Sequence, residues 1–260
     1  MKNLFDLTHK VTVITGGGGL LGKAFARGFA SYGAQVIIAE IDEEKGIRAC
    51  EELKKDGYTA RFLLLDIADE KSVINGVTQI LKEEGRIDVW INNAYPRTKD
   101  WGVSFEKIPF NSWQENINKH LNGYCLCCQK VTEIMKEAKK GSIINIASIY
   151  GIVAPDFSIY EGTDMTMPAA YAAIKGGVIQ FTKYLASYYG NHGVRVNAIS
   201  PGGIFDSQPQ SFVKNYIKKT PLQRMASAEE IVGAAIFLAS DASAYVTGHN
   251  LVVDGGWSII

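Results

Sequence analysis

Strand-like and helix-like stretches alternate along almost the whole chain of 260 residues, and this alternation restricts the fold more than any single motif does. Short apolar runs rich in branched residues suit strands that are buried on both faces of a parallel sheet. Seven such runs occur, at 11–15, 35–39, 60–65, 88–92, 142–147, 194–199 and 250–254. Amphipathic stretches lie between them, at 20–31, 43–55, 70–84, 111–138, 171–190 and 228–240. The pattern predicts a doubly wound α/β fold in which helices cover both faces of a parallel sheet of about seven strands.

No linker, repeat or low-complexity tract interrupts this pattern, so we expect a single domain over residues 1–260. Two segments, 152–170 and 203–221, depart from the rhythm because they are long and rich in Pro, Gly and polar residues. Each follows the end of a predicted strand. Ligands of such sheets bind outside the carboxyl ends of the strands, so we expect both segments to form walls or lids of the substrate site.

The charge and apolar patterns exclude several classes of protein. Twenty-seven basic residues balance twenty-seven acidic ones, so no overall field attracts nucleic acid or an anionic membrane. The apolar runs are too short to cross a bilayer, and the N-terminus shows no signal-peptide pattern. We therefore expect a cytoplasmic protein. Cys50, Cys125, Cys127 and Cys128 lack the spacing of metal ligands, so we expect no metal site and expect the last three to be small buried side chains.

The first predicted strand runs into a glycine-rich turn, Thr15-Gly-Gly-Gly-Gly-Leu-Leu-Gly22, and then into a helix. Glycines in this position allow a tight turn and let backbone N–H groups approach a pyrophosphate at the helix N-terminus. A purely structural turn does not require four consecutive glycines. Two registers fit, one on Gly17, Gly19 and Gly22 and one on Gly16, Gly19 and Gly22. The turn predicts a dinucleotide-binding fold of the Rossmann type.

Glu40 ends the second predicted strand, eighteen residues after Gly22. A carboxylate at this place accepts hydrogen bonds from the adenosine ribose and repels a 2′-phosphate. No Arg or Lys lies within 16–22 or 38–44 to clamp such a phosphate. The sequence therefore favours NAD over NADP, the alternative being that Glu40 is a solvated strand end.

Tyr171 and Lys175 lie four residues apart in a predicted helix, so their side chains share one face. Free tyrosine has a pKa of about 10, and a nearby ammonium group lowers it by favouring the phenolate. A phenol with a lowered pKa can exchange a proton with an alcohol or a carbonyl. Tyr and Lys often occur at this spacing by chance, so the pair indicates a catalytic function only together with the other motifs.

Together these residues resemble the short-chain dehydrogenases/reductases over nearly the whole chain. The resemblance rests on the glycine turn at 15–22, Asp66, Asn92-Asn93-Ala94, Ser148, Tyr171 with Lys175, Asn197, Pro201-Gly202 and Asp254-Gly255-Gly256. It implies that Ser148 hydrogen-bonds the substrate carbonyl oxygen, that Tyr171 is the general acid/base, and that Lys175 binds the nicotinamide ribose. It also implies cofactor-binding residues, namely Gly16, Gly19, Leu20, Leu21, Gly22, Glu40, Asp66, Ile67, Asn93, Ala94, Tyr171, Lys175, Pro201, Gly202 and Ile204.

The chain departs from the family pattern at several positions. Leu20 occupies the place of a usual glycine, and Asp206 that of a usual Thr. His120 stands where an Asn often completes the catalytic set. We include His120 among the candidate catalytic residues as a proton relay, because imidazole titrates near neutrality. The alternative is a core histidine with both nitrogens satisfied.

Ser148 and Tyr171 are twenty-three residues apart, which is longer than is usual in the family. We expect the insertion to overhang the substrate and to offer Tyr160, Glu161, Thr163 and Asp164 to a polyhydroxyl compound. The string EGTDMTMPAAYAAIK is similar to a subgroup associated with bacterial surface-carbohydrate and flagellin-glycan biosynthesis. It implies a sugar or amino-sugar substrate.

Two alternative functions remain open, and the sequence also predicts an oligomer. The first alternative is a general reductase of ketones or 3-oxoacyl groups, and the second is a non-catalytic NAD-binding sensor or scaffold. Apolar residues in excess of one sheet face on 111–138 and 171–190 predict a homo-oligomer, a dimer or a tetramer. The partner we expect is a small molecule, with no nucleic acid and no membrane.

Overall fold

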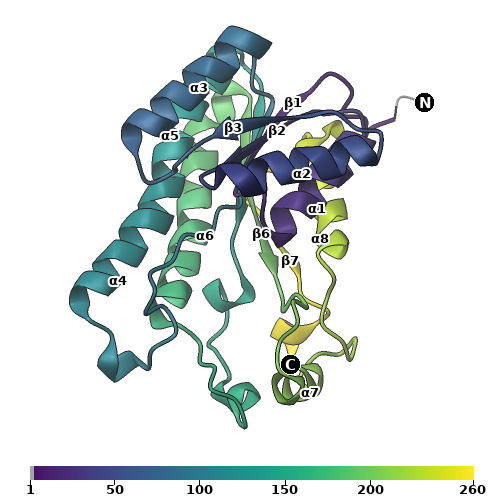
Figure 1. The fold of residues 1–260 in the computed structure, drawn as a ribbon. Coiled ribbons are helices and arrows are strands. Elements are labelled where there is room, and N and C mark those ends of the chain that lie inside the picture. The colour runs from purple at the N-terminus through teal and green to yellow at the C-terminus, as the bar shows by residue number, and fades with distance from the viewer. Residues whose placement is uncertain (1–2) are drawn as a thin grey trace.

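The computed structural model describes residues 3–260. Seven parallel strands form one sheet in the order β3-β2-β1-β4-β5-β6-β7 (Figure 1). Their bounds are β1 Val11–Thr15, β2 Gln35–Glu40, β3 Ala60–Leu64, β4 Val89–Asn92, β5 Gly141–Ile146, β6 Val194–Pro201 and β7 Asn250–Val253. The predicted fold class is confirmed, since every strand begins and ends within two residues of its predicted bounds.

Helices cover both faces of the sheet (Figure 1). One face carries α1 Leu20–Ser31, α2 Glu43–Lys55 and α8 Glu229–Ala239, and the other carries α3 Glu70–Glu84, α5 Gly123–Glu137 and α6 Ala169–Tyr189. Side chains of each strand alternate between the two cores, so that Val13 joins one apolar cluster and Ile14 the other. Asp42 and Asp69 cap α2 and α3 by accepting hydrogen bonds from the backbone N–H groups of Lys45 and Ser72. None of the helices within residues 3–260 is long and apolar enough to span a membrane.

The predicted helix at 111–138 is divided. It consists of α4 Phe110–Ile117, a widened π-helical turn at Asn118–Asn122, and α5. The widened turn carries His120, whose side chain is fully buried. Turns of this kind are frequent at functional sites. The expectation for the cysteines was wrong in one case, because Cys125 on α5 is exposed while Cys127 and Cys128 are buried.

The two irregular segments pack against each other. Segment 203–221 contains a helix, α7 Gln210–Ile217, that the Pro- and Gly-rich sequence did not indicate. Ile159 from segment 152–170 shares a third apolar cluster with Phe212 and Tyr216 of α7. Three polar contacts add to it: Ser211 Oγ donates to Gly162 O, Asn215 Nδ2 donates to Glu161 O, and Lys219 is ion-paired with Asp156. The segments therefore form one structural unit at the carboxyl edge of the sheet.

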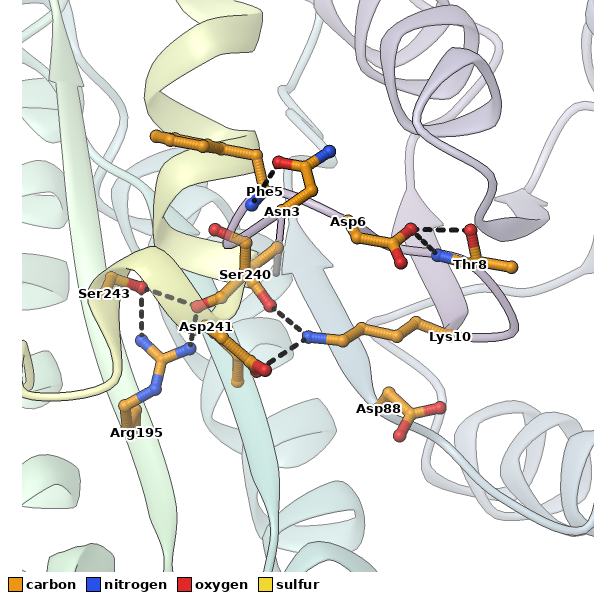
Figure 2. A network of polar contacts seen from close by, with 12 residues as sticks. Asn3, Phe5, Asp6, Thr8, Lys10, Asp88, Arg195, Ser240, Asp241 and Ser243 are labelled. Atoms are coloured by element: carbon orange, nitrogen blue, oxygen red, sulfur yellow. Dashed lines mark hydrogen bonds and ion pairs between the residues drawn. The ribbon is translucent and has the colours of Figure 1, made fainter. Parts of the chain in front are cut away.

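A polar network closes the opposite, amino-terminal edge of the sheet (Figure 2). Lys10, just before β1, donates to the carbonyl of Ala239 and lies 3.6 Å from a carboxylate oxygen of Asp241. Arg195 of β6 donates to the hydroxyl of Ser243 and to the carbonyl of Ser240. These contacts attach the end of α8 to two strands, so the network serves the architecture and lies away from the carboxyl edge.

Candidate active site

A cleft of about 980 Å³ runs along the carboxyl ends of the strands. All but two of the candidate site residues line it: Gly16, Gly19, Leu20, Leu21, Glu40, Asp66, Ile67, Asn93, Ala94, Ser148, Tyr171, Lys175, Pro201, Gly202 and Ile204. The two that do not are Gly22 and His120. The cleft occupies the place where open α/β sheets bind ligands.

The glycine turn forms one end of this cleft. Gly16 has φ +62°, which favours glycine, and a Cβ there would lie 2.7 Å from Ala94 Cα. A Cβ on Gly22 would lie 2.2 Å from Gly16 O, so Gly22 allows α1 to pack beneath the turn. Gly17 packs against Ile38 and stays out of the cleft. Of the two registers, the geometry therefore matches Gly16, Gly19 and Gly22.

Asn93 fixes the turn to the end of β4. Its Nδ2 donates to the carbonyls of Thr15 and Gly16, at 3.0 and 3.1 Å. Its backbone N–H donates to Thr15 Oγ1 at 3.0 Å. The neighbouring Asn92 lies in the core, where its Nδ2 donates to Asn145 Oδ1 of β5 at 2.8 Å. Both asparagines therefore position the strands that end at the cleft.

Glu40 is a buried residue, so it is not the solvated strand end that was the alternative. Its Oε2 accepts from the backbone N–H of Gly18 at 3.1 Å, and its Oε1 accepts from Ile41 N–H at 3.0 Å. Sequence reasoning missed Lys45, which also lines the cleft. Lys45 lies one residue beyond 38–44, the range in which the sequence was searched for cations. The packing of α2 against the glycine turn brings Lys45 to the cleft, and its Nζ pairs with Asp42 at 3.0 Å.

Ser148, Tyr171 and Lys175 come together in the middle of the cleft. Ser148 follows β5, and the other two lie one turn apart on α6. The Tyr171 ring is held edge-on by Tyr95 and Trp101, with ring centroids 5.6 and 6.2 Å apart. The Nζ atom of Lys175 lies 5.4 Å from the Tyr171 ring centroid. The structure thus places a phenol, an amine and a hydroxyl group in the same cleft.

The predicted lowering of the Tyr171 pKa is wrong for this structure. Burial raises the pKa of Tyr171, and a hydrogen bond with Ser148 opposes this rise. Lys175 is also fully enclosed, and burial lowers its pKa to about 7. Near neutral pH the ammonium form is thus only partly populated, and its effect on the phenol is correspondingly reduced.

His120 lies behind Lys175, outside the cleft. Lys175 Nζ donates to Ile146 O at 2.6 Å and lies 3.4 Å from His120 Nε2. Burial and the charge of Lys175 hold the pKa of His120 well below its usual range, so the ring is neutral. An ammonium that donates to Nε2 places the ring proton on Nδ1. Within residues 3–260 this Nδ1 has no hydrogen-bond partner, so the alternative of a fully satisfied core histidine does not fit.

The insertion contributes only part of the predicted polar set. Tyr160 and Asp164 line the cleft, whereas Glu161 and Thr163 do not. Asp206, at the position of the family's usual Thr, also reaches the cleft. Sequence reasoning missed Tyr95, Trp101, Tyr150 and Phe212 in the wall. The position of Tyr150, two residues after Ser148, is a signal that was available; the others depend on tertiary packing.

Residues 19–258 match a family model described as enoyl-(acyl carrier protein) reductase. A post-translational flagellin modification protein A from Campylobacter coli is 35% identical over 97% of this chain and 100% of its own length. A 3-oxoacyl-acyl-carrier-protein reductase from Chlamydia muridarum is 36% identical, covering 96% and 98% of the two chains. A 5-keto-D-gluconate 5-reductase from Escherichia coli K12 is 34% identical, covering 98% of each.

Solved structures show the same similarity. The crystal structure of gox2181 superposes with a TM-score of 0.90 at 31% identity over 98% of each chain. A gluconate 5-dehydrogenase from Burkholderia cenocepacia, in complex with NADP and tartrate, gives 0.89 at 29% identity over 99% of this chain and 98% of that chain. A short chain dehydrogenase from Leptospira borgpetersenii with bound NAD+ gives 0.86 at 35% identity over 99% and 96%.

Proposed function

Because this chain belongs to the short-chain dehydrogenase/reductase family, whose members bind a nicotinamide cofactor, we propose that it interconverts an alcohol and a carbonyl on a sugar or amino-sugar derivative, with NAD as cofactor. The observation that carries the proposal is the convergence of Ser148, Tyr171 and Lys175 in one cleft that continues to the glycine turn.

The residues of the cleft fit such a cofactor. Gly16 and Gly19 present backbone without side chains at the N-terminus of α1, which suits a pyrophosphate. The Glu40 carboxylate, held by Gly18 and Ile41, suits the ribose hydroxyls and opposes a 2′-phosphate. Lys45, which also lines the cleft, works against this preference. Relatives with NAD and with NADP both occur, so the choice of NAD rests on Glu40.

A nicotinamide cofactor held by these residues would supply or accept the hydride. In the oxidation direction Tyr171 would take the proton of the substrate hydroxyl as the alcohol carbon gives up its hydride. Ser148 then holds the oxygen of the carbonyl product by a hydrogen bond. Protonated Lys175 would favour the phenolate form, against the burial that raises the pKa of Tyr171.

We assign His120 a supporting role in the same proposal. Its neutral Nε2 lies 3.4 Å from Lys175 Nζ, which suits a side chain that accepts a hydrogen bond from the Lys175 ammonium group and exchanges a proton with it.

The test follows nicotinamide absorbance with NAD and, separately, NADP against sugars, amino sugars, their phosphates and their nucleotide conjugates. We expect NAD-linked turnover of a sugar derivative by the wild type and its loss in Tyr171→Phe, which removes the acid/base hydroxyl and keeps the ring. Binding of NADH, measured by fluorescence, should persist in the variant. NADH binding without turnover of any alcohol or carbonyl would instead identify a non-catalytic sensor or scaffold.

Reduction of 3-oxoacyl groups is the second candidate, favoured by the Chlamydia relative. An acidic carrier protein needs a basic surface, which Arg97, Lys99 and Lys107 or the lysines of α7 could provide. Lys219 is ion-paired with Asp156, and Lys214 and Lys218 line a separate cavity of about 940 Å³. The same assay with 3-oxoacyl substrates separates the two candidates.

We also propose that the protein is a homo-oligomer, either a dimer or a tetramer. Tyr184 and Tyr188 on α6 are each 60% exposed, and their rings stack with centroids 6.0 Å apart. An exposed aromatic pair on the outer face of a helix suits an interface. Light scattering of the wild type and of Tyr184→Ser checks the mass in solution, and a monomeric wild type would contradict this part of the proposal.

A further inference from the structure

The hydroxyl oxygen of Tyr150 is buried and makes no hydrogen bond of good geometry within the described residues 3–260. A buried hydroxyl without such a bond is costly, so natural proteins rarely keep one without a use. Tyr150 lines the active-site cleft. The position of the unpaired group therefore points to a ligand.

Tyr150 is tied to the catalytic serine. Its backbone N–H donates to Ser148 Oγ at 3.2 Å. Its ring meets the Trp257 ring edge-on, with centroids 5.8 Å apart and planes at 86°. Trp257 is buried and also stacks on Tyr216 of α7. The Tyr150 ring is thus held in place close to the group that binds the reacting oxygen.

The insertion closes the space around this hydroxyl. Tyr160 lines the same cleft, and its hydroxyl lies 3.4 Å from Met167 Sδ, to which it donates. Burial raises the pKa of Tyr150, and the charge of Tyr160 and a hydrogen-bond interaction with it raise this pKa further, so the group stays a protonated donor at neutral pH. The contact between the two phenols falls short of good hydrogen-bond geometry. Asp164 and Thr166 add polar groups to the same wall.

We propose that the Tyr150 hydroxyl determines substrate specificity by hydrogen-bonding a hydroxyl group of the substrate near its reacting carbon. This inference rests on the proposed oxidoreductase function and narrows its substrate to hydroxylated carbonyls and polyols. A site built to pair with a substrate hydroxyl rejects the analogue without it, because a buried polar group is then left unpaired. A ketone of the same shape that lacks this hydroxyl group leaves the Tyr150 hydroxyl unpaired.

The experiment compares wild type and Tyr150→Phe, which removes only the hydroxyl, on two ketones. These are 1-hydroxy-2-butanone and 3-pentanone, and the first has a hydroxyl group where the second has a methyl group. A second pair consists of the best hydroxylated carbonyl substrate of the sugar panel and its deoxy analogue. Thermal unfolding of the ligand-free proteins is measured beside the kinetics. Tyr245→Phe is the matched control, since Tyr245 is fully exposed and outside the cleft.

In the wild type we expect kcat/KM to favour the hydroxylated member of each pair. In Tyr150→Phe that preference should fall by about tenfold or more. The unfolding temperature of Tyr150→Phe should equal or exceed that of the wild type, because an unpaired buried group has been removed. Tyr245→Phe should keep the wild-type preference.

An unchanged preference in Tyr150→Phe, or a wild type that prefers the plain ketones, would overturn the role of Tyr150 and leave the oxidoreductase function standing. A clear fall in unfolding temperature would also count against it, because it would show that the hydroxyl already has a structural partner. Absence of turnover with every carbonyl would instead refute the proposed function itself.

Discussion

The carboxylate of Glu40 accepts a hydrogen bond from the backbone N–H of Gly18 at 3.1 Å, which joins the end of β2 to the glycine turn. Lys45 lines the same part of the cleft with the opposite charge. Cofactor preference should therefore depend on the balance between these two side chains.

Glu40→Ser should raise the ratio of kcat/KM for NADP to that for NAD by about tenfold or more, because it removes the charge that repels a 2′-phosphate. Adding Lys45→Met to this variant should reverse much of the gain. The control is Glu43→Ser, which removes an exposed carboxylate from α2, the helix that carries Lys45. An unchanged ratio in Glu40→Ser would show that another group selects the cofactor.

Gly19 and Gly22 should respond differently to a methyl group. A Cβ on Gly22 would lie 2.2 Å from Gly16 O, whereas the nearest atom to a Cβ on Gly19 is 3.4 Å away. Gly22→Ala should therefore lower the unfolding temperature, and Gly19→Ala should fold normally but bind NADH about tenfold more weakly, because its methyl enters the cleft. Thermal unfolding and NADH fluorescence titration measure the two effects. Normal NADH binding by Gly19→Ala would place the pyrophosphate elsewhere.

The sequence predicted the fold and the centre of the cleft for a physical reason. Strand and helix periods are local, and Thr15–Gly22 or Tyr171 with Lys175 place their chemistry within one or two turns of chain. Glu40 was found because it ends a strand, and parallel strands all bring their carboxyl ends to one edge.

What the sequence did not predict depends on packing between distant elements. Lys45 reaches the cleft because α2 packs over the turn, and Trp101 because the long connection after β4 folds back over Tyr171. The predicted direction of the Tyr171 pKa shift was wrong because sequence spacing shows the charge pair, whereas the burial that raises the pKa of Tyr171 depends on the packing of distant elements.

His120→Ala should lower kcat and change its dependence on pH, because the variant removes the one imidazole that faces Lys175 Nζ. His120→Asn, with the amide usual in the family, should retain more activity than His120→Ala. His9→Ala, an exposed histidine, serves as the control. Rates for His120→Ala that match the wild type across the pH range would end the relay hypothesis and leave a packing role.

The stability of the protein should rise with pH above neutrality because of Lys175. Its pKa is about 7 in the folded chain, well below the ordinary value of 10.5. Between these pH values the unfolded chain binds the extra proton, so the free energy of unfolding increases with pH, by at most about 1.4 kcal/mol per pH unit for one group. Below pH 7 the cost of burying the charge is fully present.

Lys175→Met should therefore unfold at higher urea concentrations than the wild type at pH 6–7, and the difference should shrink toward pH 9. Lys183→Met, on the exposed side of the same helix, is the control for loss of a charge. Urea unfolding at several pH values measures both. Parallel curves for wild type and Lys175→Met would mean that the buried lysine keeps its ordinary pKa.

The ion pair between Asp156 and Lys219 joins the insertion to the segment that follows α7, and it should affect substrate binding more than stability. Both side chains are partly exposed, and ion pairs of this kind contribute little to folding. Lys219→Met should leave the unfolding temperature unchanged and raise KM for the substrate severalfold, because the wall that carries Tyr160 and Asp164 loses an attachment. KM for NAD should change less, since neither Asp156 nor Lys219 lines the cleft and the glycine turn and Glu40 lie on other elements. Lys219→Arg, which keeps the charge, should restore the wild-type KM, and Lys218→Met is the control for charge on the same surface. An equal rise of both KM values in Lys219→Met would show instead that the contact supports the cleft as a whole.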